Sequence, residues 1–441
     1  MVQAAAPTRF LRSSPTLRTG VSAQLLATAS QLVGFAQLLL LIAPGSSRTT
    51  DAYMILFGAT QLVVTVWIVG VVYPTHLAEP ARAWKHTVAC SGAAAAVLAA
   101  AGVGFLLALG YPVAPVVGVG TALALSGALA AAAATYSVIL ACAGRPLSLA
   151  GLALLPNVVA TAALLATHGT TSTTRTVAMC GALALGNGAL CCLLQPRAHE
   201  VLSHCRVSQP TPSVVRPRGW LVMAAIVGGI SPLALQGALA AFPQGVLTHF
   251  TVAYKFGLTL TGALVNSLLP LLVSWRNLAR ARLRQTVLVS LSAAGPAALV
   301  CRELAGHNTF GTSLAPAAIA LLAGWAFVVP TTSVATQIVV RSGDFLAFRT
   351  TGLLNGGLTS AGIVYAVITR QPTAVALTLL VVQVAVSVVL FRRSAQAAEG
   401  WLTLAAGAVC LPVAFAPLLS IPAVVAMTLL PLRRLSAAPV T

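Results

Sequence analysis

Long apolar stretches separated by short polar loops follow one another along the whole chain. A helix needs about 20 apolar residues to cross the hydrocarbon core of a bilayer, and twelve stretches have roughly that length or more. The pattern predicts an all-α, polytopic membrane protein and leaves no room for a soluble domain. We place the spans at 21–43, 52–73, 86–110, 113–143, 147–167, 174–195, 219–241, 247–274, 283–301, 313–340, 346–369 and 372–391.

The segment after the twelfth span is less regular. Residues 401–431 are apolar, but three prolines interrupt them: Pro412, Pro417 and Pro422. One long helix would place Arg433 and Arg434 on the side of the membrane that holds few basic residues, whereas two short helices would return them to the basic side. We therefore expect about fourteen membrane helices, with thirteen as the alternative.

Basic residues gather in alternate loops, and this asymmetry predicts the topology. The N-terminal tail and every second loop hold most of the arginines, whereas the opposite loops hold only Arg48, Arg175, Arg302 and Arg370. Under the positive-inside rule the N-terminus lies in the cytoplasm and the protein in the cytoplasmic membrane. The first span is too long for a signal peptide, so we interpret it as a retained helix.

The composition agrees with this picture. The 441 residues are 58% hydrophobic and 7% charged, with a mean hydropathy of +0.94, which excludes a soluble protein. The net charge of +19 lies mainly in the loops, where it sets topology, so we expect no nucleic-acid partner. The eight cysteines lie mostly in apolar runs without the spacing of metal ligands, and we expect neither a metal nor another cofactor.

The spans also repeat. Adding about 196 to the start of each of the first six spans gives the approximate start of each of the second six. Because six is even, the two halves share one orientation and would be related by a pseudo-two-fold axis along the membrane normal, with a site between them. We divide the chain into a cytoplasmic tail (1–20), an N-lobe of six spans (21–195), a cytoplasmic linker (196–218), a C-lobe of six spans (219–391) and a C-terminal helical hairpin with its tail (392–441).

Lys255 is one of two lysines in the chain and lies inside the eighth span. A charge near the middle of a membrane costs about 2.5 to 3.5 kcal/mol on insertion scales, so such a residue normally faces a wet cavity or a partner. Polar residues recur at helical spacing around it and form a polar stripe along an apolar helix: Thr248, Thr251, Lys255, Thr259, Gly262 and Asn266.

Three stretches resemble the lipid-exporting branch of the multidrug/oligosaccharidyl-lipid/polysaccharide exporter superfamily, which includes MurJ-like and Wzx-like flippases. TTDAYMILFGATQLVVTVWIVGVVYP (49–74) is similar to their second helix, with an Asp-Ala-aromatic triplet and a closing proline. THFTVAYKFGLTLTGALVNSLLPLL (248–272) resembles the eighth helix, with a basic residue after Ala-Tyr. ILACAGRPLSLAGLALLPNVVATAALL (139–165) resembles the connection between the fourth and fifth helices.

The resemblance implies a two-lobed flippase that opens alternately to each side and moves a lipid-linked oligosaccharide, usually on a polyprenyl diphosphate. It implies that Lys255 binds the head group, and that Asp51 and Tyr53 belong to the outer-loop element. The first two helices lack the arginines of MurJ-like proteins, which favours a Wzx-like or specialised glycolipid over lipid II. The candidate substrate-binding residues are Lys255, Thr251, Thr259, Asn266, Tyr254, Gln24, Thr28, Gln31, Gln61, Tyr53 and Asp51.

Structural explanations stand beside each candidate. Lys255 could extend to the outer interface, the glutamines and threonines could form interhelical hydrogen bonds, and Tyr53 and Tyr254 could belong to an interfacial aromatic belt. We expect Arg302 and Glu303 to form an ion pair in an outer loop.

No catalytic arrangement is visible, because the six acidic residues fall in or beside loops. The alternatives are a small-molecule or multidrug antiporter of the same superfamily or of the major-facilitator type, and a non-transporting scaffold for envelope synthesis. An antiporter would be expected to hold a carboxylate within the membrane. The expected partners are the lipid-linked substrate, membrane lipids and envelope-synthesis enzymes, and we expect a monomer.

Overall fold

The computed structural model describes residues 17–45, 47–64, 84–143, 145, 147–204, 219–261, 276–307, 314–342, 346–394 and 396–436. Every regular element in these ranges is a helix. Of the described helices, ten are long and apolar enough to cross a membrane, and two shorter apolar helices, Met223–Leu239 and Pro417–Pro431, add to them. The predicted all-α, multi-pass membrane fold is confirmed.

The N-terminal helix group covers the first six predicted spans. Its helices are α1 (Leu17–Ile42), α2 (Arg48–Leu62), α4 (Trp84–Ala108), α5 (Val113–Cys142), α6 (Leu147–Ala150), α7 (Leu154–Ala166) and α8 (Ser172–His204). The inner part of the second predicted span lies outside the described residues.

The C-terminal helix group covers the remaining spans and the C-terminal segment. Its helices are α9 (Gly219–Leu239), α10 (Val246–Thr261), α12 (Arg276–Gly306), α13 (Pro316–Ser342), α14 (Leu346–Thr369), α15 (Pro372–Arg393), α16 (Ala397–Phe415) and α17 (Pro417–Ser436). The end of the eighth predicted span lies outside the described residues. The helix order agrees with the repeat, and the axis relating the two halves stays a prediction.

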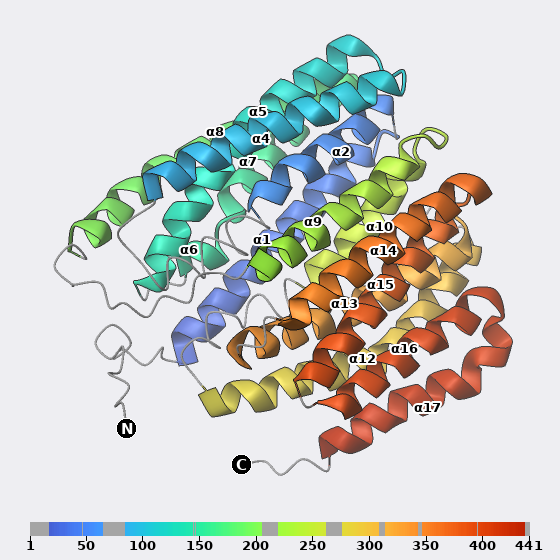
Figure 1. Cartoon of the computed structure of the whole chain (residues 1–441). Coiled ribbons are helices and arrows are strands. Elements are labelled where there is room, and N and C mark those ends of the chain that lie inside the picture. Colours follow the sequence, from blue (N-terminus) through green and yellow to red (C-terminus); the bar gives the residue numbers. More distant parts are fainter. Residues whose placement is uncertain are drawn as a thin grey trace.

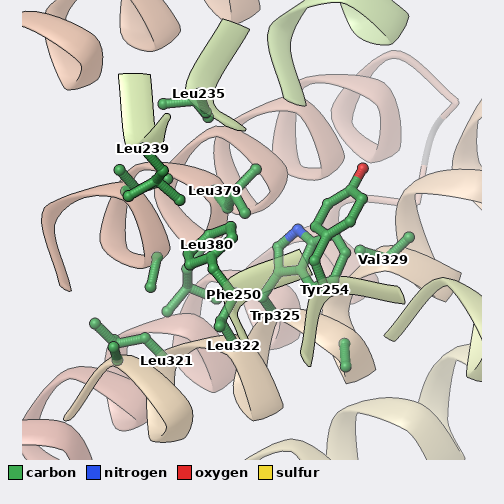
Figure 2. Packing of buried hydrophobic residues seen from close by; sticks show 14 of the residues in the cluster. Leu235, Leu239, Phe250, Tyr254, Leu321, Leu322, Trp325, Val329, Leu379 and Leu380 are labelled. Carbon is green, nitrogen blue, oxygen red and sulfur yellow. The ribbon is translucent and has the colours of Figure 1, made fainter. Parts of the chain in front are cut away.

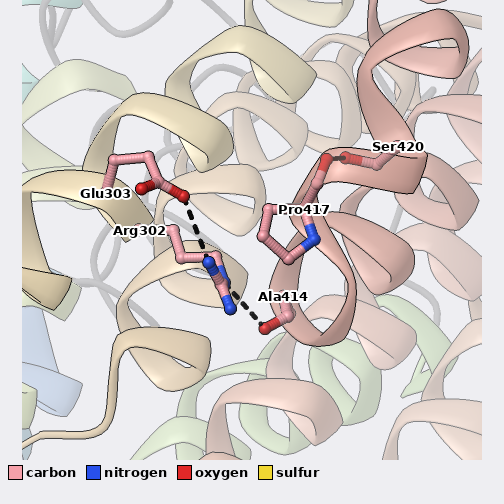
Figure 3. A network of polar contacts seen from close by, with 5 residues as sticks. All are labelled: Arg302, Glu303, Ala414, Pro417 and Ser420. Atoms are coloured by element: carbon pink, nitrogen blue, oxygen red, sulfur yellow. Dashed lines mark hydrogen bonds and ion pairs between the residues drawn. The ribbon is translucent and has the colours of Figure 1, made fainter.

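The C-terminal segment is a pair of helices. The chain turns at Ala416, and Pro417 begins α17, where its missing N–H leaves no helical hydrogen bond unmade. Arg302 of α12 holds this turn, because its Nε donates to the carbonyl oxygen of Ala414 at 3.0 Å (Figure 3). The same guanidinium pairs with Glu303 at 3.1 Å. The prediction of fourteen helices and the Arg302–Glu303 ion pair are both confirmed.

A second ion pair holds the other end of this hairpin. The Nε atom of Arg284 lies 2.9 Å from Oε1 of Glu399, joining the first half of α12 to the first turn of α16. The Glu399 side chain is buried, whereas that of Arg284 is about half exposed. Helix α12 therefore contacts the hairpin through a charged group near each end.

Three predicted spans differ clearly from the observed helices, and one of them, the ninth at 283–301, forms only the middle of the longer α12. The fifth, 147–167, is interrupted between α6 and α7, because the ring of Pro156 has no N–H and would clash with the carbonyl four residues earlier in a continuous helix. The sixth does not end at 195 but continues through Pro196 to His204. Ala198 and Leu202 are buried against Tyr136 and Leu140 of α5, which favours the longer helix.

The two helix groups meet along four helices. Figure 1 shows α4, α5, α7 and α8 on one side of the molecule and α12 to α17 on the other, with α1, α2, α9 and α10 between them. Helix α10 contacts both α1 and α2, and α2 also contacts α9. We call the end of the bundle that holds residues 43–47, 109–112, 167–171 and 240–245 the outer end, following the predicted topology.

Candidate functional site

Helices α2 and α10 lie beside each other and both run inward from the outer end. Two pairs of residues, Asp51 with Thr248 and Phe57 with Lys255, fix their alignment. The pairs are separated by about two helical turns on each helix, since a turn takes about 3.6 residues. One contact thus closes the outer end, and the other lies deeper in the bundle.

Asp51 joins the two helix groups at the outer end. It lies in the first turn of α2, which Ser47 caps by accepting a hydrogen bond from the Thr50 N–H. The carboxylate is buried and accepts hydrogen bonds from the N–H of Gly245 at 3.2 Å and of Thr248 at 3.1 Å. The Thr248 hydroxyl donates a third, at 2.6 Å. Asp51 therefore caps α10, satisfying amides that have no partner within that helix.

A second contact between the groups lies next to this cap. The hydroxyl of Tyr111, in the loop before α5, donates to the carbonyl oxygen of Ala240 at 3.1 Å. The Arg48 guanidinium lies 4.9 Å from the centroid of the Tyr111 ring and donates to the same carbonyl at 3.5 Å. Burial raises the pKa of Tyr111, while the Arg48 hydrogen bond lowers it, and the net shift is upward. The phenol therefore stays a hydrogen-bond donor at neutral pH.

Lys255 contacts an aromatic ring of the other helix group. Its Nζ atom lies 3.9 Å from the centroid of Phe57, a cation–π contact between α10 and α2. The lysine side chain is partly exposed. Three carboxylates in the described part of the chain have other partners: Asp51 caps α10, Glu303 pairs with Arg302, and Glu399 pairs with Arg284. None of the described carboxylates forms an ion pair with Lys255. Among the described residues, Lys255 is therefore a cation that contacts an aromatic ring and pairs with no carboxylate.

The surroundings of Lys255 change from aromatic to polar along the helices. Phe35 of α1 packs against Phe256, the residue after Lys255 in α10, at 5.7 Å between ring centroids. Residues four apart share a face of a helix, and one turn further from the outer end each helix carries a partly exposed polar side chain: Gln31 on α1, Gln61 on α2 and Thr259 on α10. Thr28 of α1, also partly exposed, lies another turn inward.

The polar stripe predicted on the eighth span is not exposed along its whole described length. Thr251 of the stripe is buried, and so is Tyr254, the neighbour of Lys255 in the chain, whose ring stacks on Trp325 of α13 with centroids 4.7 Å apart (Figure 2). Thr248 binds Asp51, and among the described members of the stripe only Lys255 and Thr259 are partly exposed. The described part of the stripe is therefore covered near the outer end and partly exposed further inward, at Lys255 and Thr259.

The remaining candidates fall into two sets. Tyr53 is buried and packs against Phe57 with ring centroids 5.3 Å apart, so neither Tyr53 nor Tyr254 belongs to an exposed aromatic belt. Asn266 lies outside the described residues, as does the side chain of Gln24. Binding by any of the eleven candidates stays a prediction.

Comparison with known proteins supports the fold. No family model matches the chain, and no curated protein matches it by sequence. Among solved structures, the chain is similar to "Lipid II flippase MurJ, inward closed conformation", with a TM-score of 0.55 and 12% identity, over 94% of this chain and 98% of that one. The chain therefore has the fold of MurJ along nearly its whole length, and the expected resemblance is confirmed at that level.

Proposed function

We propose that this multi-pass membrane protein is a flippase for a lipid-linked sugar, acting in the cytoplasmic membrane with its N-terminus in the cytoplasm. The observation that carries the proposal is the position of Lys255. It is a partly exposed cation without a described countercharge, it lies between two helix groups, and it belongs to a chain with the MurJ fold. A phosphate carried between the groups would give this ammonium the anionic partner that Phe57 cannot provide.

The polar side chains inward of Lys255 fit the sugar part of such a substrate. Gln31, Gln61 and Thr259 are partly exposed on three different helices, and amides and hydroxyls both donate and accept hydrogen bonds. Hydroxyl-rich head groups need such partners when they leave water, because unpaired polar groups are costly in an apolar medium. The apolar lipid chain would stay in the bilayer during the movement.

Movement by alternating access requires the outer end to open. In this conformation Asp51, Tyr111 and Arg48 of the N-terminal helix group hold the start of α10 and the loop before it. We propose that these contacts break when the two groups separate at the outer end and re-form when they close. They would thus stabilise the closed outer end and set the free energy of opening.

The same proposal also covers the oligomeric state, the source of the substrate and the partner enzymes. The flippase would act as a monomer, take its lipid-linked substrate from the inner leaflet and work beside enzymes that synthesise the cell envelope. The antiporter alternative is less favoured, because the acidic residues that pair in the described part of the chain lie at the helix ends, where they hold structural contacts.

Translocation in proteoliposomes tests the proposal. The probes are two fluorescent lipids that carry one sugar on the same polyprenol, one through a monophosphate and one through a diphosphate. Membrane-impermeant quenching measures their movement between leaflets. Faster movement of at least one probe than in protein-free liposomes supports the flippase. Movement of neither, by protein that elutes as a single folded species, would reject it and leave the antiporter and scaffold explanations.

A further inference from the structure

The four helices between the two groups carry very little charge. The predicted spans that form α1, α2, α9 and α10 are residues 21–43, 52–73, 219–241 and 247–274, and together they contain one lysine, no arginine and no acidic residue. The lysine is Lys255. The charge available to a head group within this part of the membrane is therefore a single positive one.

Two other described arginines near these helices are engaged at the helix ends. Arg48, at the outer end, covers the Tyr111 ring and donates to Ala240. Arg349, near the inner end of α14, lies 5.2 Å from the centroid of the Trp220 ring at the start of α9. Both lie at the ends of the helices, so neither provides a second cation beside Lys255 in the middle of the membrane.

Phosphate linkages between a polyprenol and a sugar differ in charge. A monophosphate linkage is a phosphodiester with one negative charge, whereas a diphosphate linkage carries two. One ammonium neutralises the first, but it leaves one charge of the second without a partner in a low-dielectric setting, where an unpaired charge is strongly disfavoured. The Phe57 ring gives no help, because the face of an aromatic ring is negative and attracts cations.

We propose that the preferred substrate is a sugar linked to a polyprenol through a single phosphate. The proposal rests on the flippase function proposed above and narrows it to a monoanionic head group. Charge balance between Lys255 and one phosphodiester makes the bound state neutral, and Gln31, Gln61 and Thr259 supply neutral hydrogen-bonding groups to the sugar.

The test compares the two probes, matched in sugar and polyprenol, in the same proteoliposomes. We expect the monophosphate probe to move about tenfold faster or more, which corresponds to about 1.4 kcal/mol. A fluorescent phosphatidylglycerol, which is also a monoanionic phosphodiester, separates sugar recognition from phosphate charge alone. We expect it to move no faster than in protein-free liposomes.

A second cation should reverse the preference. Gln61→Arg adds a positive charge one turn from Phe57, and we expect it to raise the rate of the diphosphate probe relative to the monophosphate probe. Gln61→Met, of similar length and without charge, is the matched control: it loses the amide that we assign to the sugar, so we expect both rates to fall while the ratio of the two rates stays that of the wild type. A variant that does not elute as a folded monomer is replaced by Gln31→Arg with Gln31→Met.

The outcomes separate the two proposals. If the diphosphate probe moves as fast as the monophosphate probe or faster, the flippase function stands and the monoanionic head group is wrong. If phosphatidylglycerol moves as fast as the monophosphate probe, the inference is also overturned, because the protein would then not recognise the sugar. If no probe moves, the flippase proposal fails and the inference falls with it.

Discussion

The Thr248 hydroxyl donates a 2.6 Å hydrogen bond to Oδ1 of Asp51, which joins the first turns of α10 and α2. The two residues belong to different helix groups and lie 197 positions apart in the chain. Because the same carboxylate also accepts two backbone N–H groups, its removal would leave the start of α10 without a cap. The cap of α10 at the outer end thus depends on one buried side chain.

Removing the Asp51 carboxylate should loosen the start of α10. Hydrogen bonds to a charged group contribute about 1.5 to 3 kcal/mol each. We therefore expect Asp51→Ala to raise amide hydrogen exchange at Gly245 and Thr248 by roughly tenfold or more, measured by mass spectrometry on peptides covering 240–250. Thr248→Val loses only the hydroxyl bond and should show a smaller increase. Unchanged exchange in Asp51→Ala would show that the carboxylate does not hold α10.

Packing between α10 and α13 leaves no room for a side chain at Gly257. A Cβ atom there would lie 2.5 Å from Cζ3 of Trp325 and 2.8 Å from Cβ of Ala326. Trp325 cannot move aside freely, because its ring stacks on Tyr254 (Figure 2). Overpacking of this kind costs about 1 to 3 kcal/mol, so we expect Gly257→Ala to lower the melting temperature.

The matched control for Gly257 is Gly104 in α4, where an added Cβ would meet nothing within 4 Å. Gly104→Ala should leave the melting temperature unchanged or raise it slightly, since alanine favours a helix by up to about 1 kcal/mol over glycine. If the two variants melt at the same temperature, the close approach of α10 to α13 is not as described.

The Arg284–Glu399 pair should contribute to the attachment of the C-terminal hairpin. Glu399 is buried and Arg284 is half exposed, so solvent screens part of the attraction. We expect Glu399→Gln to destabilise the fold by about 1 kcal/mol. A thiol-reactive dye measures this on heating, after the exposed Cys90 and Cys192 have been blocked in the folded protein, as earlier labelling of the buried Cys180 and Cys410.

Glu303→Gln is the control for this pair, because Glu303 pairs with Arg302 at an exposed position and such pairs contribute between about 0 and 1 kcal/mol. It should leave the dye-detected melting curve close to that of the wild type. A larger shift for Glu303→Gln than for Glu399→Gln would contradict the assignment of Arg284–Glu399 as the contact that holds the hairpin.

Hydropathy and loop charge predicted most of the fold. The apolar runs give most of the helices, and the basic side chains of Arg433 and Arg434 favoured the two-helix ending that the structure has. The break at residues 151–153 was not predicted, because those residues are as apolar as a spanning helix and Pro156 lies beyond the break itself. At Pro196 the opposite error occurred. The sixth span was expected to end before this proline, but the helix continues, and burial of Ala198 and Leu202 favours the longer α8.

The candidate site was predicted less completely. Lys255 stands out in the sequence because a charge in an apolar span is rare, but Phe57 carries no such signal, since phenylalanine is common in membrane helices. The link from Asp51 to Thr248 joins distant parts of the chain, and no local pattern reveals it. Helical spacing also grouped Thr251 with Lys255 but did not predict that Thr251 is buried, because periodicity does not say which neighbour each part of a face meets.

The central claim is that Lys255 binds the phosphate of the transported lipid, and side-by-side translocation by Lys255 variants tests it most directly. Lys255→Met keeps a long apolar side chain and removes the charge, whereas Lys255→Arg keeps the charge. All three proteins are reconstituted at equal density and assayed with the monophosphate and diphosphate probes. We expect Lys255→Met to lose at least roughly tenfold in rate and Lys255→Arg to retain most of it. Equal rates for the wild type and Lys255→Met would contradict the claim.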